Sequence, residues 1–162
     1  MKPLASLLCL LAILFIALNA CEKKSVENTA GKLSFELIED QILATSCATT
    51  GCHASTADAS YAQHGLVLSK GVAFSNLVGK MAKNPAAAAL KLQLVKPFDA
   101  DNSFLFHKIS CQTSHHSATA NFGSQMPLGG NYLTQGQVEF INRWINAGAT
   151  ATETGISTAV LK

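Results

Sequence analysis

The chain has 162 residues, of which 48% are hydrophobic and 14% are charged. Its 12 basic and 10 acidic residues nearly balance, and no basic stripe interleaved with aromatic residues occurs, so nucleic acid is not expected as a partner. The length beyond residue 20 suits one domain with a hydrophobic core of its own.

Residues 1–20 have the features of a lipoprotein signal peptide. Lys2 gives a positive start, and the apolar run over residues 4–17 is short for a helix that spans a membrane. Leu18-Asn19-Ala20-Cys21 resembles the bacterial lipobox, which implies that Cys21 is lipidated and becomes the mature N-terminus. We therefore expect the lipid to anchor the protein to a membrane of the bacterial cell envelope, facing the periplasm.

Residues 21–33 are predicted to be this lipidated N-terminus followed by a polar tether. Ser34 can then cap a helix, on which Phe35, Ile38 and Ile42 recur at helical spacing. The sequence predicts that this helix runs into Cys47.

The segment Cys47-Ala48-Thr49-Thr50-Gly51-Cys52-His53 places two thiols directly before an imidazole. This order is typical of covalent haem binding, in which each thiol adds to a porphyrin vinyl group and the histidine takes an axial position on iron. Four residues separate the cysteines instead of the usual two, so we expect the gap to bulge outward, with Gly51 at positive φ. We predict one covalent haem c, held by Cys47 and Cys52, with His53 as the proximal ligand.

Other uses of the two cysteines are open. A disulfide between Cys47 and Cys52 is compatible with the oxidising periplasm, although it gives no reason for His53 to follow directly. A zinc site is disfavoured because it needs four ligands, and no second close pair exists. Cys111 has no assigned partner under any of these schemes.

Two more helices are predicted before residue 110. The first begins at Ser69 and ends near residues 83–85, with apolar residues along one side. These are Phe74, Leu77, Val78 and Met81. The second is short, is capped by Asp101 or Ser103, and carries Phe104, Leu105 and His107.

The last predicted helix has the clearest signals. Thr134 and Gln137 form a capping box, and Gly148 ends the helix. Its apolar stripe consists of Val138, Ile141, Trp144 and Ile145. The predicted fold is therefore mostly helical.

If haem is present, its iron needs a second axial ligand or an open position. The candidates in the mature chain are Met81, Met126, His64, His107, His115 and His116. We favour Met126, because it lies in a loop rich in proline and glycine that can bring a thioether over the ring. Met81 is expected to fill the core, and His107 to be a hydrogen-bonding partner. His64 is expected at the surface, and His115 with His116 in an exposed loop or a weak metal site.

Five segments, in this order along the chain, resemble the small cytochrome c domains of the planctomycete-type group, which are relatives of class I cytochromes c. The segments begin at Ser46, Gly65, Asp101, Met126 and Ile141. The resemblance covers about residues 35–149. It implies an all-α, cytochrome c-like domain packed around one covalently attached haem, with the first and last helices in contact beside it. It also implies Cys47 and Cys52 as attachments, His53 as proximal ligand and Met126 as distal ligand.

These predictions divide the chain into a signal peptide (1–20), a tether (21–33), a cytochrome c-like domain (34–150) and a C-terminal tail (151–162). The expected function is that of an electron-transfer lipoprotein, which carries one electron between redox partner proteins of the envelope. One alternative is a haem enzyme or small-ligand sensor with a displaceable sixth ligand. Another is a haem-free lipoprotein that a disulfide braces.

Overall fold

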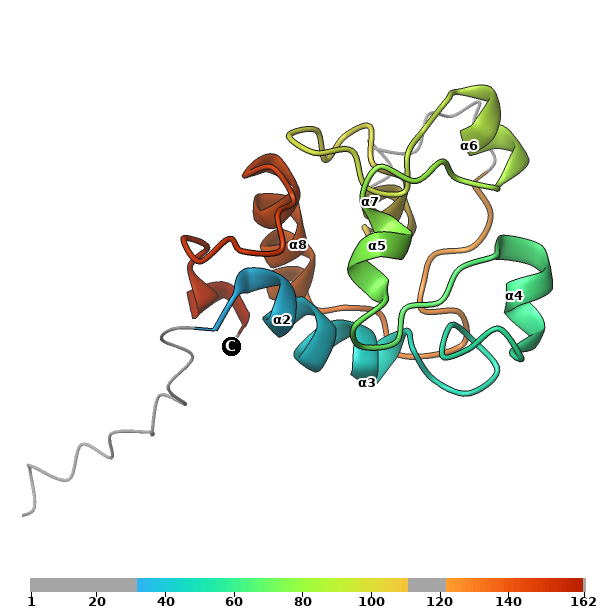
Figure 1. Cartoon of the computed structure of the whole chain (residues 1–162), viewed down its shortest axis with the longest axis horizontal. Coiled ribbons are helices and arrows are strands. Elements are labelled where there is room, and N and C mark those ends of the chain that lie inside the picture. Colours follow the sequence, from blue (N-terminus) through green and yellow to red (C-terminus); the bar gives the residue numbers. More distant parts are fainter. Residues whose placement is uncertain (1–31, 111–121, 162) are drawn as a thin grey trace, which may run out of the picture. The chain divides into compact units, whose positions relative to one another are not determined.

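A computed structural model describes residues 32–110 and 122–161. The predicted signal peptide, Cys21, most of the tether, Cys111, His115 and His116 lie outside these ranges. The described part is mostly helical and has isolated bridges but no β-sheet (Figure 1), as the sequence predicts. Within it, no helix combines the length and the apolar composition that crossing a membrane requires.

The first helical segment runs without interruption over residues 34–46. It consists of α2 (Ser34–Ile38), a π-helical turn η1 (Glu39–Leu43) and α3 (Ala44–Ser46). Phe35, Ile38 and Ile42 are buried on one face, as predicted. The predicted cap is wrong by one residue: Leu33 is the N-cap, and its N–H donates to the Glu36 carboxylate (3.2 Å).

The predicted helix from Ser69 to residues 83–85 is much shorter in the structure. Only α5 (Ala73–Leu77) forms, because Val78 is extended and Gly79 adopts φ +71°. Beyond it, Met81 forms an isolated bridge to Gln93. The Met81 side chain is 53% exposed, so the prediction that it fills the core is wrong.

Two short helices were not predicted. Helix α4 (Ala59–His64) ends at Gly65, which has φ +57°. Helix α6 (Pro85–Ala89) begins at Asn84, whose side-chain oxygen accepts the Ala87 N–H.

The two helices predicted nearer the C-terminus are confirmed. Helix α7 (Phe104–Ile109) has Ser103 as its N-cap, although the Ser103 hydroxyl bonds Lys96 and Asp99 instead of the helix. Helix α8 (Gln135–Asn146) has the predicted capping box of Thr134 and Gln137. A 3-10 helix η2 (Thr158–Leu161) follows and packs against α8.

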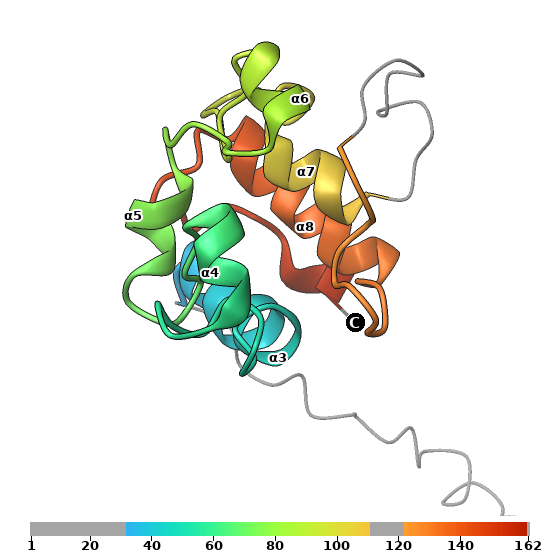
Figure 2. The same cartoon turned by 90° about the vertical axis from the view of Figure 1, so that its right-hand side faces the viewer.

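The larger of two hydrophobic clusters joins α2, α7 and α8. Helices α2 and α8 are in contact, with the rings of Phe35 and Trp144 5.0 Å apart. Helices α7 and α8 are also in contact and lie side by side in Figure 2. The smaller cluster lies around α6 and the start of α7. It consists of Ala82, Ala87, Leu92, Phe104 and Phe122.

Candidate functional site

The motif loop, residues 47–58, leaves the end of α3 and folds back on itself. The Cys47 N–H still continues the helix by donating to Leu43 O (2.9 Å). The His53 N–H then donates to Cys47 O (3.2 Å), so the chain returns to the first cysteine despite the longer gap. Residues 49–52 are exposed, and Gly51 has φ +84°. The predicted outward bulge is confirmed.

Asp58 holds this bulge, a role that sequence reasoning missed. Its carboxylate accepts the N–H groups of Gly51 (2.7 Å) and Ser55 (2.6 Å). These hydrogen bonds, that of Gly51 first, lower the pKa of Asp58. Asp58 is also the N-cap of α4, and the Ser60 hydroxyl of that helix donates to Cys52 O. An aspartate just before a short helix was the signal available in the sequence.

The imidazole of His53 is oriented by the backbone of residues 66–68. Its Nδ1 lies 3.1 Å from the carbonyl oxygen of Leu66, and His53 O accepts the Leu68 N–H (2.7 Å). Because a carbonyl oxygen only accepts, this contact is a hydrogen bond when Nδ1 carries the proton. The lone pair then lies on Nε2, which is how proteins prepare a histidine to ligate a metal.

Both cysteines of the motif are free thiols in the structure. Cys47 is half-buried and packs against the larger cluster, whereas Cys52 is exposed. Burial, and next the charge of Cys52, raises the pKa of Cys47 to about 11. Cys47 therefore stays protonated at neutral pH.

His64, predicted at the surface, is exposed and lies beside the motif. Its ring centroid is 6.0 Å from that of His53. Burial, then the charges of His53 and Lys108, lowers the pKa of His64.

Met126 lies at the end of a segment that runs along α7. We call residues 122–126 the strap. The Met126 N–H donates to Lys108 O (2.7 Å), and Gln125 Nε2 donates to Ile109 O (3.2 Å). The Met126 side chain is half-buried.

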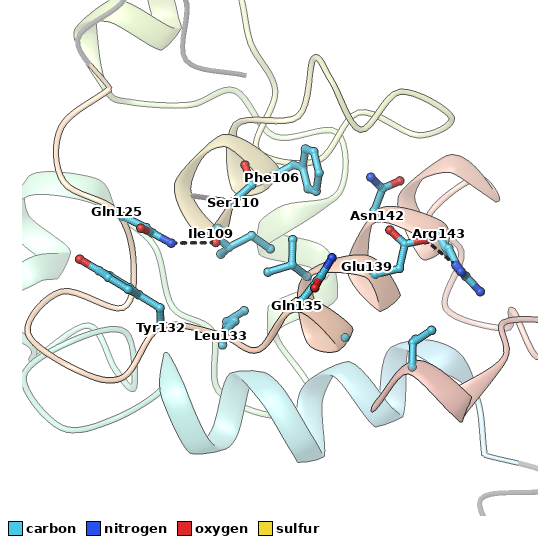
Figure 3. Close-up of a pocket in the computed structure, with 13 residues that line it drawn as sticks. Phe106, Ile109, Ser110, Gln125, Tyr132, Leu133, Gln135, Glu139, Asn142 and Arg143 are labelled. Atoms are coloured by element: carbon cyan, nitrogen blue, oxygen red, sulfur yellow. Dashed lines mark hydrogen bonds and ion pairs between the residues drawn. The ribbon is translucent and has the colours of Figure 1, made fainter. Parts of the chain in front are cut away.

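A depression with a volume of about 750 Å³ lies between α7, α8 and the segment 125–133 (Figure 3). Figure 3 shows Gln125 and Tyr132 at one side of it, and Glu139 with Arg143 at the other. Neither the motif cysteines nor His53 line this depression. It meets the candidate site only at Gln125, the neighbour of Met126.

His107, expected to be a hydrogen-bonding partner, is buried beside Phe122, with ring centroids 5.1 Å apart. Among the residues described, no group of three or more histidine, cysteine, aspartate or glutamate side chains could hold a metal ion. The structure places Cys47, Cys52 and His53 on one loop with the ring of His64 beside that of His53, and it places Met126 on a separate support.

The donor groups of the motif suit a haem. The chain offers two free thiols on one loop, an imidazole whose Nδ1 faces a carbonyl, and a thioether on a supported segment. Comparisons with protein-family models, curated proteins and solved structures gave no match to this chain. The functional assignment therefore depends on the residues themselves.

Proposed function

We propose that this protein is a haem c-binding electron-transfer lipoprotein of the bacterial cell envelope. The observation that carries the proposal is His53, which follows two free thiols and has Nδ1 against the carbonyl of Leu66. A contact of this kind is typical of a histidine that ligates a metal, because it orients the ring and leaves Nε2 for the metal. A disulfide between Cys47 and Cys52 would not need it.

In this proposal Cys47 and Cys52 hold haem c covalently, and His53 and Met126 ligate its iron. Haem iron held by histidine and methionine supplies one-electron oxidation and reduction at a comparatively high potential. The chain's own contribution is to orient the ligands. The Leu66 carbonyl fixes the His53 ring, and the strap fixes the backbone of Met126.

Occupation of both axial positions by the protein favours electron transfer over the alternatives of a haem enzyme or a small-ligand sensor. Those activities need an open or easily displaced position on iron. A lipid on Cys21 would keep the domain at one membrane surface and raise its local concentration near redox partner proteins there.

The deciding experiment is a pyridine haemochrome assay with an intact mass of the full-length protein, produced in a bacterium that matures c-type cytochromes. We expect one covalent haem per chain. The double substitution Cys47→Ala with Cys52→Ala is the control and should carry none. A colourless protein whose mass is lower by two hydrogen atoms would instead establish the haem-free, disulfide-containing alternative.

Substitution of Met126 tests the distal ligand. In the reduced, haem-loaded protein, Met126→Ala should raise the association rate of carbon monoxide by at least about tenfold, because no protein ligand must leave first. Met81→Ala is the matched control, since Met81 is exposed and lies on another segment. Equal rates in the two variants would rule out Met126.

A further inference from the structure

One residue, Lys108 on the last turn of α7, makes several of the contacts that hold the strap. Its ammonium donates to the carbonyl oxygen of Phe122 (2.9 Å) and also to that of Ser124. The backbone oxygen of the same residue accepts the Met126 N–H. Lys108 thus contacts the beginning, the middle and the end of the strap.

The ammonium of Lys108 differs in its partners from several other lysines in the described part of the chain. Lys32 and Lys70 pair with Asp40, and Lys96 pairs with Asp99. Lys108 instead donates to backbone carbonyls of the strap. Its charge is therefore used to hold a segment of main chain in place.

The surroundings of this ammonium are partly apolar. It lies 6.0 Å from the ring centroid of Phe104, and burial lowers the pKa of Lys108. Removing an ammonium from water is costly unless hydrogen bonds replace the lost hydration. The carbonyls of Phe122 and Ser124 supply these bonds, so the strap and the lysine stabilise each other.

We propose that Lys108 is a positioning residue for Met126: its ammonium fixes the strap against α7 and so keeps the thioether in one place. The proposal rests on the proposed function in so far as Met126 is an iron ligand. Lys108 itself does not ligate the metal.

Amide hydrogen exchange in the full-length protein tests the clamp directly. Lys108→Met keeps most of the aliphatic stem but removes the ammonium and its two hydrogen bonds to the strap, so the Met126 amide should exchange about tenfold faster. Lys80→Met is the matched control, since it removes the same charge from an exposed side chain. Lys108→Arg, which keeps charge and donors, should restore much of the protection.

Unchanged exchange at Met126 in Lys108→Met would overturn the proposal. If that variant does not fold, Lys108→Gln gives the same comparison, because its shorter amide cannot reach both carbonyls. Haem content and carbon monoxide association are measured on the same samples. A haem-loaded Lys108→Met that exchanges faster but binds carbon monoxide no faster than wild type also overturns it.

The two proposals fail separately. If the wild-type protein proves colourless, the proposed function falls, and exchange alone then judges whether Lys108 holds the strap. If haem is present, Met126 amide exchange and carbon monoxide association must both be faster in Lys108→Met, and both must return toward the wild-type rates in Lys108→Arg.

Discussion

The motif loop and the strap carry the two proposed iron ligands, yet they are held in different ways. In the motif loop, Asp58 bonds Gly51 across only seven positions of sequence. Backbone hydrogen bonds within the loop, such as that from His53 N–H to Cys47 O, hold the rest of it. In the strap, the Lys108 ammonium reaches carbonyls 14 and 16 positions away. A local loop costs less chain entropy to close than a distant contact. The bulge of the motif loop is therefore built locally, whereas the strap depends on the tertiary fold, as does the contact of His53 with Leu66, 13 positions away.

The hydrophobic support of the two segments also differs. Cys47 packs against the larger cluster, which joins α2, α7 and α8. The strap begins at Phe122, which is buried in the smaller cluster, edge to face with Phe104 at 5.4 Å. We therefore expect the strap to loosen more readily than the motif loop.

Trp144→Ala should have the largest effect, because Trp144 is fully buried in the larger cluster and its Nε1 donates to Thr150 O (2.9 Å). We expect a loss of about 3–5 kcal/mol in the free energy of unfolding. Denaturant unfolding measures it. This cluster supports the motif loop through Cys47 and the strap through α7, so the amides of both segments should lose protection from exchange together. Loss of protection at the strap alone would contradict the comparison.

Phe122→Ala should separate the two segments. Removing this ring leaves a cavity in the smaller cluster, and we expect a loss of about 3 kcal/mol, at the low end for such changes. Relative to wild type, amide exchange should be accelerated more at Met126 than at Leu43, whose carbonyl oxygen accepts the Cys47 N–H at the start of the motif loop. Equal acceleration at both amides would mean that one cooperative unit contains them.

Alkylation kinetics should separate the two cysteines in a haem-free sample that retains the fold. Because the pKa of Cys47 is raised to about 11 from an ordinary value of 9.0, its thiolate fraction at pH 8 should be about 100-fold lower than in the unfolded chain. Peptide mass spectrometry with and without denaturant measures this ratio. The exposed Cys52 should react first, and faster labelling of Cys47 would show that the thiol is not packed as described.

Asp58→Asn should have the smallest effect, confined to the motif loop. The pKa of Asp58 is lowered in the folded protein, so its contribution is present above the ordinary value of 3.8 and is lost as the pH falls through the lower, folded value. Because asparagine has no carboxylate to protonate, the motif loop of the variant should show no such acid-dependent loosening below pH 3.8. Nuclear magnetic resonance of the Gly51 amide is the measurement, and identical acid titrations in both proteins would contradict the assigned role.

Several features of the fold could be predicted because their signals are local. The capping box of Thr134 and Gln137, the buried stripe of α8 and the positive φ of Gly51 each depend on a few neighbouring residues. The helix predicted from Ser69 failed for a non-local reason. Its second half pairs instead with residues 93 and 94. Met81 forms a bridge to Gln93, and the carbonyl oxygen of Lys80 accepts the Leu94 N–H.

By itself, the sequence determined the helical class, the position of the thiol and imidazole motif and the conformation of its bulge. It could not determine which carbonyl meets His53, nor which side chain holds Met126. Leu66 and Lys108 carry no local signal for these roles, because each acts across a turn or a helix that must first be placed. The first pairing arises only when residues 66–68 lie beside the motif loop, and the second only when the strap lies along α7, since a hydrogen bond between distant residues needs the fold to bring them into reach.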